Sequence, residues 1–304
     1  MQPITIFRGT TGLNTVADPA RIPMTKSGVN DVAEIVNMRI DQYGRPSRRP
    51  GLTLMHSGVF HSLFCDKGDC FVMQTRTNDD AIMRVATDGS LSGVRSGLTS
   101  GLRMSWAQHG DKTYYSNEME AGVITDGISE PWTLGGYYGP ETNRSFTIPE
   151  RIRHLQILSG RMFVSSGEVV WWTEPFRFDL FDLASSFVQF NTKIRMLKSV
   201  DGGLFISSSK STYFLSGFSP NEFTSRKVAD FPAVEFSDSN EYVEGADIGL
   251  DPGRCALWAS AEGAILGTPS GAIINLTKSK IIYPENVTKG FGALVGYEFI
   301  HGME

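Results

Sequence analysis

The feature that most constrains the fold of this chain is a loose repeat of short apolar strands separated by glycine turns. Each copy has an apolar strand, a turn with glycine and often aspartate, and a second apolar strand that ends in Ser or Thr. Because glycine adopts positive φ cheaply, such turns are typical of tight β-hairpins. The strand pairs are 61–65 with 70–75, 104–108 with 113–116, 154–158 with 161–165, 195–200 with 203–207, and 255–260 with 263–267.

The spacing of the turn glycines indicates propeller blades. Gly68, Gly110, Gly160, Gly202 and Gly263 are 42, 50, 42 and 61 residues apart. A four-stranded blade repeats every ~40–50 residues, which all but the last interval approach. Third strands follow several hairpins, at 168–173, 211–216 and 271–277. The sequence therefore predicts an all-β fold, a β-propeller-like domain of about five to six blades.

Two parts of this architecture are less regular. Residues 292–300 and a strand from the N-terminal region are expected to form a split sixth blade, which would close the ring and hide its edge strands. Residues 174–183 are rich in phenylalanine and are expected to form an aromatic loop between blades, in the core or at an interface. Two packed sheets or a meander with the same hairpins remain as the alternative topology.

The N-terminal region does not repeat and differs in charge from the rest. The pattern predicts an extended assembly segment at 1–55 and the propeller-like domain at 56–304. The first 51 residues hold seven basic and four acidic side chains, whereas the whole chain has a net charge of −5. Two interpretations stay open: this basic end docks on an acidic neighbour, or its arginines bond nearby backbone carbonyls.

Composition excludes several classes of function. With 28 basic and 33 acidic side chains, the chain offers no general attraction to phosphate backbones, which disfavours wrapping of duplex DNA. The first eight residues lack an export signal, and no run of about 18 apolar residues occurs, so we expect no membrane contact and a location inside the producing cell. Cys65 and Cys70 flank a turn, where a cross-strand disulfide and half of a metal site are the alternatives.

Motifs for common enzymes are missing. The sequence contains no Gly-x-Ser-x-Gly elbow, no phosphate-binding loop and no His-Glu-x-x-His pattern. The five histidines stand singly, and Asp88, Asp126 and Asp201 each precede glycine as turn residues do. We therefore predict no enzymatic activity, no cofactor and no bound metal. A propeller glycosidase, with acids converging on a central channel, is the catalytic alternative.

One segment resembles a known family. Residues 33–51 contain Asn37, Ile40-Asp41, Gly44-Arg45 and Arg48-Arg49-Pro50-Gly51, after an Asn14-x-x-x-Asp18-Pro19 element. This run resembles the N-terminal segment of tailed-bacteriophage virion proteins, and the similarity extends through the blade hairpins. The best-known relatives are the propeller-type tail hub or nozzle proteins of short-tailed phages, which help to retain packaged DNA. This chain is shorter and shows fewer complete blades.

The resemblance implies a structural role. The chain would be a virion component of the tail or head–tail junction, such as a hub, nozzle or tail-tip subunit, assembled in the cytoplasm of the host bacterium. Its partners would be portal, adaptor or tail proteins and further copies of itself in a ring, with transient contact to packaged DNA. The alternative is a receptor- or glycan-binding propeller that uses its aromatic loops, with residues Tyr114, Tyr115, Tyr137, Tyr138, Trp171 and Trp172.

The predicted site residues fall into two groups. A strand, a turn at Gly44 and a second strand stopped by Pro50-Gly51 would place three arginines at the end of a hairpin. These assembly residues are Arg45, Arg48 and Arg49. The glycines expected to hold structural turns are Gly44, Gly51, Gly160, Gly202 and Gly263.

Overall fold

The computed structural model of the chain shows an all-β propeller with five blades, which confirms the predicted fold. It describes residues 10–22, 30–40, 43–49, 51, 53–66, 68–136, 144–217, 219–278, 280–284, 286–296 and 298–303. Within these ranges there is no α-helix, and no described helix is long and apolar enough to cross a membrane. The short 3-10 helices are η1 (Pro19–Arg21), η2 (Pro220–Glu222) and η3 (Gly245–Ile248).

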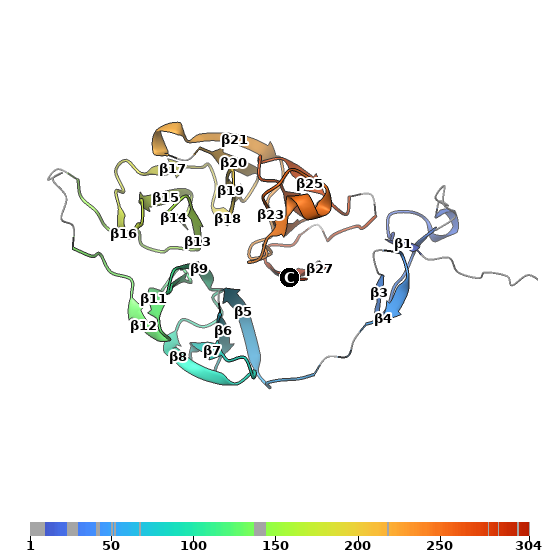
Figure 1. Cartoon of the computed structure of the whole chain (residues 1–304), viewed down its shortest axis with the longest axis horizontal. Coiled ribbons are helices and arrows are strands. Elements are labelled where there is room, and N and C mark those ends of the chain that lie inside the picture. The colour runs from blue at the N-terminus through green and yellow to red at the C-terminus, as the bar shows by residue number, and fades with distance from the viewer. Residues whose placement is uncertain are drawn as a thin grey trace, which may run out of the picture.

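The first two blades are four-stranded antiparallel sheets whose strands pair in chain order. Figure 1 shows them side by side, with the strand that begins each blade nearest the centre. The first blade comprises β5 (Val59–Asp66), β6 (Asp69–Thr75), β7 (Asp80–Val85) and β8 (Leu91–Leu98). The second comprises β9 (Ser105–His109), β10 (Lys112–Ser116), β11 (Ala121–Thr125) and β12 (Ile128–Pro131).

The remaining three blades continue the ring in the same direction (Figure 1). The third comprises β13 (His154–Leu158), β14 (Arg161–Ser166), β15 (Val169–Glu174), β16 (Arg177–Phe181) and β17 (Phe187–Gln189). The fourth comprises β18 (Ile194–Val200), β19 (Gly203–Ser208), β20 (Thr212–Ser216) and β21 (Thr224–Ala229). The fifth comprises β22 (Val243–Glu244), β23 (Arg254–Ser260), β24 (Gly263–Gly267) and β25 (Ile273–Asn275).

The aromatic segment of the third blade is a strand, so the loop predicted at 174–183 is wrong. Phe178 and Leu180 alternate with Arg177 and Asp179 along β16 and are buried, because a half-buried strand places every second side chain in the core. Phe181, the last residue of the strand, is buried as well. Phe176, by contrast, occupies the β15–β16 turn with a positive φ of 57° and is exposed.

The core lies between adjacent blades rather than in a single centre. Trp106 of the second blade stacks on Phe64 and Phe71 of the first, with ring centroids 5.9 and 5.8 Å apart. Phe205 and Trp258 make the corresponding contact between the fourth and fifth blades at 5.2 Å. Apolar clusters of this kind lie between each pair of successive blades from the first to the fifth, so these blades are held by their neighbours.

The sixth position of the ring holds only a two-stranded hairpin, β26 (Gly290–Val295) and β27 (Glu298–Met303). It packs on the fifth blade through Leu294 and Phe299, near the centre of the molecule (Figure 1). Among the described residues, no N-terminal strand pairs with it. The described residues thus do not form the predicted split sixth blade, since the C-terminal hairpin and the described N-terminal strands form separate sheets.

The N-terminal segment, residues 10–49, stands beside the propeller (Figure 1). Its described strands pair only with one another. β1 (Thr10–Leu13) runs parallel to β2 (Asn30–Val32), and β3 (Met38–Ile40) forms a hairpin with β4 (Pro46–Arg48).

Cys65 and Cys70 face each other across the β5–β6 turn and are joined by a disulfide. Of the two alternatives left open by the sequence, the structure therefore takes the cross-strand disulfide.

Gly160 and Gly202 occupy equivalent turns but are needed for different reasons. Gly160 has φ of +72°, a conformation that residues with a Cβ adopt only with strain. Gly202 does not have positive φ, so the reason expected for it is wrong. A Cβ on Gly202 would instead lie 2.3 Å from the carbonyl oxygen of Pro269 in the fifth blade. The glycine at 202 thus permits two blades to approach.

The other predicted turn glycines differ in whether the structure requires glycine at their positions. Gly44 and Gly263 have positive φ, of +75° and +138°. Gly51 has neither positive φ nor any atom within 4 Å of a Cβ built on it, so nothing in the described structure requires glycine there. Pro50, its expected partner in stopping the strand, lies outside the described residues.

We predict that Gly160→Val and Gly202→Val each lower the free energy of unfolding by about 1–3 kcal/mol, the first through backbone strain and the second through overpacking. Gly93→Val in β8 is the matched control, because Gly93 is exposed, has ordinary φ and meets no atom within 4 Å. Urea denaturation followed by tryptophan fluorescence gives all three values. If the Gly202 variant is as stable as the Gly93 variant, the close approach to Pro269 is unimportant.

Candidate functional site

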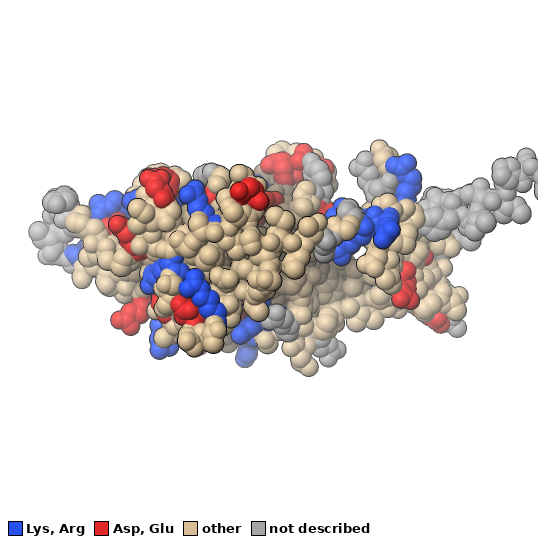
Figure 2. All heavy atoms as spheres, turned by 90° about the horizontal axis from the view of Figure 1, so that it is seen from below, with Lys and Arg blue, Asp and Glu red and all other residues tan. Residues whose placement is uncertain are grey.

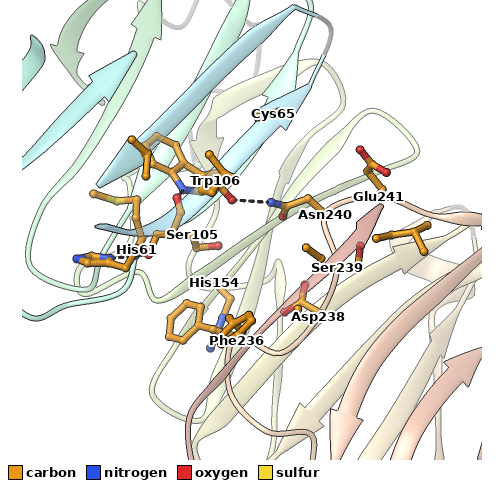
Figure 3. Close-up of a pocket in the computed structure, with 18 of the residues that line it drawn as sticks. His61, Cys65, Ser105, Trp106, His154, Phe236, Asp238, Ser239, Asn240 and Glu241 are labelled. Carbon is orange, nitrogen blue, oxygen red and sulfur yellow. Dashed lines mark hydrogen bonds between the residues drawn. The ribbon is translucent and has the colours of Figure 1, made fainter. Parts of the chain in front are cut away.

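A cavity of about 630 Å³ occupies the centre of the ring. Its walls come from the innermost strands β5, β9, β13 and β18, from residues 236–241 and from β26 (Figure 3). This size lies within the ~300–1,000 Å³ typical of small-molecule pockets. The first four blades each contribute their inner strand to the walls, so the cavity is formed by the ring itself.

The fifth blade contributes an irregular inner segment, residues 233–242, in place of a long first strand. Val234 N and Ser239 N donate to the carbonyls of Ala259 and Leu257 on β23, at 2.8 and 2.9 Å. Between them Phe236 has a positive φ of 62°, which breaks the extended conformation. This irregularity is a bulge, which interrupts the alternation of side chains between the two faces of the strand in a segment that lines the cavity.

A second bulge, in β5, brings the first blade to the fifth. Ser62 has φ of +53°, and the β5–β6 register shifts between His61 and Phe64. The carbonyl of Leu63 thereby accepts a 3.1 Å hydrogen bond from Asn240 Nδ2 of the fifth blade (Figure 3). This side-chain contact spans the gap in which a complete sixth blade would stand.

His61 borders the cavity as a satisfied hydrogen-bond partner. Its Nε2 lies 3.2 Å from Asp80 Oδ2, and its Nδ1 lies 2.9 Å from Ser62 Oγ. Burial lowers the pKa of His61 and outweighs the opposing effect of Asp80. The imidazole is therefore neutral near pH 7, where it fixes the position of the bulge.

A buried charge network forms beside the cavity around Arg153. Its guanidinium donates from Nε and NH2 to the two carboxylate oxygens of Glu235, at 2.9 and 3.2 Å. NH1 donates to Glu118 Oε2 at 3.0 Å, and the guanidinium carbon lies 5.0 Å from the ring centre of Phe236. His154 Nε2 lies 3.5 Å from Glu235 Oε1. The network joins the start of the third blade to the second and fifth.

The network sets the charge state of Glu235. Burial alone would raise the pKa of this carboxyl, but hydrogen bonds and charges from His154 and Arg153 outweigh it and lower the pKa to about 2. Glu235 is thus ionised throughout the neutral range. A bidentate Arg–carboxylate pair is well matched in geometry, which a buried pair needs to offset its desolvation.

The arginines predicted as assembly residues lie away from this cavity, on the β3–β4 hairpin. The guanidinium of Arg45 lies over the ring of Tyr43 at 5.1 Å, and the side chains of Arg48 and Arg49 are exposed. Arg39, which the sequence did not single out, makes an ion pair to the last hairpin of the propeller, 2.9 Å from Glu298.

The carboxylates considered for a glycosidase do not converge. Asp88 accepts from Ser90 N in its own turn at 2.8 Å, and Asp201 pairs with Arg254 Nε at 2.7 Å. Neither these two nor Asp126 lines the central cavity. These three carboxylates therefore do not form the channel arrangement considered for that alternative, and the acidic residues that line the cavity are Asp238 and Glu241. Among the described residues, His, Cys, Asp and Glu form no group of three that would hold a metal ion.

The aromatic residues considered for glycan stacking are mostly core residues. Tyr114, Tyr115 and Trp172 are buried between blades, and Trp171 packs half-buried against the same core as Tyr114. Tyr137 and Tyr138 lie outside the described residues.

Sequence reasoning missed the segment at 233–242. The available signal was the 61-residue interval between Gly202 and Gly263, which holds the polar residues Glu235, Ser237, Asp238, Ser239 and Asn240. The extra length of that interval marked the place where a regular inner strand is replaced.

No protein family and no curated protein matches the sequence. Solved propeller structures resemble it at low identity. The extracellular domain of a putative hybrid two-component system from B. thetaiotaomicron aligns with a TM-score of 0.46 and 11% identity, over 81% of this chain and 31% of that one. This chain thus spans about a third of that protein.

Two further structures align over most of the chain. The Pan2 WD40 domain of Neurospora crassa gives a TM-score of 0.43 and 11% identity over 76% of this chain and 68% of that one. Apo AztD from Citrobacter koseri gives 0.40 and 13% over 72% and 60%.

The Arg153 network leads to a pH-dependent prediction. Glu235→Gln should lower the free energy of unfolding at pH 7 by about 3 kcal/mol, because it weakens the pairing of a buried guanidinium. The folded pKa of Glu235, about 2, lies below its usual 4.5, so its contribution to stability is present above pH 4.5 and is lost as pH falls toward 2. The difference between wild type and variant should shrink over that range.

Denaturation curves from pH 7 to pH 2 test this expectation. Asp230→Asn is the matched control, because it breaks an exposed pair with Lys227, and its cost should stay below about 1 kcal/mol. A difference between wild type and Glu235→Gln that is constant with pH would mean that Glu235 has an ordinary pKa.

Proposed function

We propose that this chain is a non-enzymatic structural subunit of a tailed-bacteriophage particle, in the tail or at the head–tail junction. The observation that carries the proposal is the N-terminal segment, which has strands but no buried apolar core. Every buried hydrophobic residue of the described structure lies at position 64 or beyond. A segment that cannot bury its apolar side chains within its own chain is suited to bury them on a partner.

The exposed side chains of the segment supply the contact area. Val36 is 65% exposed and Tyr43 71% exposed, and Met38 on β3 is also exposed. Leu54 and Met55 continue this apolar surface along the connection to the propeller, at 80% and 64%. Aromatic residues and methionine are enriched at protein interfaces, where they provide large contact area.

Polar contacts hold the segment against its own propeller. Lys280, which follows the fifth blade, donates to Thr11 O at 2.7 Å and pairs with Asp31 Oδ1 at 3.0 Å. The hydrogen bond from Thr11 has the largest effect on Asp31 and lowers its pKa. Burial opposes this effect, but hydrogen bonds from Asn14 and Lys280 add to the lowering, and the pKa falls to about 2. These contacts orient the segment and leave its apolar surface free of the propeller core.

Charge favours docking on an acidic neighbour. Figure 2 shows Lys and Arg side chains gathered on the N-terminal segment beside the propeller. The side chains of Arg48 and Arg49 have no hydrogen-bond or ion-pair partner among the described residues, although Arg49 N donates to Asn37 O at 2.9 Å. The interpretation in which these two arginines fold back onto carbonyls of their own chain thus has no support from the described contacts. The resemblance of residues 33–51 to phage virion proteins is the reason for naming a phage particle, with portal, adaptor or tail proteins as neighbours.

A propeller that binds a ligand, such as a receptor or glycan, is the second candidate. The observation that favours it is the central cavity of about 630 Å³. It does not explain the coreless N-terminal segment.

The arginines test the assembly proposal. Arg48→Ala with Arg49→Ala should leave the melting temperature unchanged and reduce incorporation of the subunit into particles at least about tenfold, as loss of charged interface partners does. Incorporation is measured by complementing a phage that lacks the gene and quantifying the subunit in purified particles. The control is Lys112→Ala on the exposed β9–β10 turn. A loss of stability large enough to explain reduced incorporation would contradict the interface role.

Removal of the whole segment gives a second test. A chain that begins at His56 should fold and melt cooperatively, because all of the apolar clusters lie within the propeller and its last hairpin. It should fail to enter particles. Circular dichroism reports folding, and unfolding of the truncated chain would show that the segment stabilises the propeller instead.

A further inference from the structure

The polar groups of the central cavity are concentrated in one segment. Asp238, Ser239, Asn240 and Glu241 follow one another along the inner edge of the fifth blade and line the cavity together (Figure 3). Asn240 is committed to the carbonyl of Leu63 through its Nδ2. The other side chains of this polar segment remain to be accounted for.

Ser239 is fully buried, and its Oγ has no hydrogen-bond partner in the described structure. Its backbone N–H is satisfied by Leu257 O, so the orphaned group is the hydroxyl alone. A buried hydroxyl without a partner costs free energy, and native structures rarely keep one that no ligand or water satisfies. Ser239 lines the cavity with its hydroxyl turned into the protein, so a rotation about χ1 would bring Oγ to the cavity, where a bound molecule supplies the missing partner.

The charged side chains of the cavity select the sign of that molecule. Asp238 and Glu241 contribute carboxylates, and none of the described lining residues is Lys or Arg. His61, the neutral partner of Asp80, adds no positive charge near pH 7. Within the described structure Glu241 has no basic partner. Lys198 is already paired with Asp238, and His154, which also lines the cavity, lies beside Glu235. An anion would therefore meet the carboxylate of Glu241 with no free cation to receive it.

A neighbouring side chain shows that this environment holds an ammonium group. Lys198 is 2% exposed, and its Nζ donates to Asn240 O at 3.4 Å and lies 3.9 Å from Asp238 Oδ2. The same Nζ lies 4.4 Å from the ring centre of Tyr242. The chain thus already places one cation against the outer side of the polar segment, by carboxylate, carbonyl and aromatic face together.

The opposite part of the cavity is apolar. Phe60 and Leu63 of the first blade, Leu155 and Leu197 of the third and fourth, and Leu294 of β26 line it. A ligand that matches both parts needs an aliphatic stem and a single charged end. A purely apolar ligand would leave the Ser239 hydroxyl and the Glu241 carboxylate without partners.

The geometry points to a binding site for an organic cation, an ammonium or guanidinium group on an aliphatic stem, in the central cavity. The charged end lies against Ser239 Oγ and the carboxylates of Asp238 and Glu241, and the stem lies along the apolar walls. Two sources offer this chemistry: a free aliphatic amine, or a lysine or arginine side chain presented by a polypeptide. The site does not depend on the proposed role in a particle.

Isothermal titration of the full chain with three probes of equal length tests the site. Hexylamine should bind at least about tenfold more tightly than hexan-1-ol, and hexanoate should bind more weakly than either, because the lining carboxylates favour a cation. Equal affinities for the three probes, or no binding of hexylamine at millimolar concentration, would overturn the proposal.

Variants assign the effect to the polar segment. Glu241→Gln should weaken hexylamine binding several-fold and leave hexan-1-ol binding unchanged. Ser239→Ala should weaken the binding of both probes, because either head group can bond the serine hydroxyl. Glu262→Gln, an exposed carboxylate in the β23–β24 turn, should change neither. Thermal melting shows whether each variant is folded, and Glu241 is exposed, so its variant should fold even if the Ser239 variant does not. Unchanged hexylamine affinity in a folded Glu241→Gln chain would contradict the assignment.

A capped Gly-Gly-Lys-Gly-Gly peptide separates the two sources. If the peptide binds at least as tightly as hexylamine and competes with it, the site takes a side chain of a polypeptide. If hexylamine binds and the peptide does not, the site takes a free amine.

Discussion

The arrangement of the blades around the axis depends on one buried guanidinium. Arg153 stands at the start of the third blade and contacts carboxylates from the second and fifth, so a single side chain joins parts of the ring that no strand pairing connects. Hydrophobic contacts between neighbouring blades are local and would hold with small changes in the angle between them. The bidentate pair with Glu235 has a fixed planar geometry and therefore specifies how the irregular segment 233–242 lies across the cavity.

The regular blades could be predicted because their determinants are local. Glycine at Gly68, Gly110, Gly160 and Gly263 has positive φ in the structure, and the flanking apolar residues alternate as paired strands require. The same local reasoning failed at Gly202. There glycine is required by Pro269, which is distant in sequence, and a close approach between blades leaves no pattern in a hairpin.

The candidate site was not predictable for a related reason. In the sequence its polar segment looks like an ordinary loop. The bulges that shape the site are centred on Ser62 and Phe236, and a positive φ at a residue other than glycine cannot be recognised from the sequence. The predicted arginines, in contrast, were recognised by resemblance. The structure shows where their hairpin stands and adds Arg39, whose pairing with Glu298 joins residues far apart in the sequence.

The incomplete sixth position affects how the ring opens. In a closed propeller, strands from the two ends of the chain are hydrogen-bonded within one blade, and separating them breaks a ladder of backbone bonds. Here β5 pairs with β6 alone, and the first and fifth blades meet through the side chain of Asn240. Among the residues that the structure describes, no strand ladder joins these two blades, so we expect them to part at a lower free-energy cost than global unfolding requires.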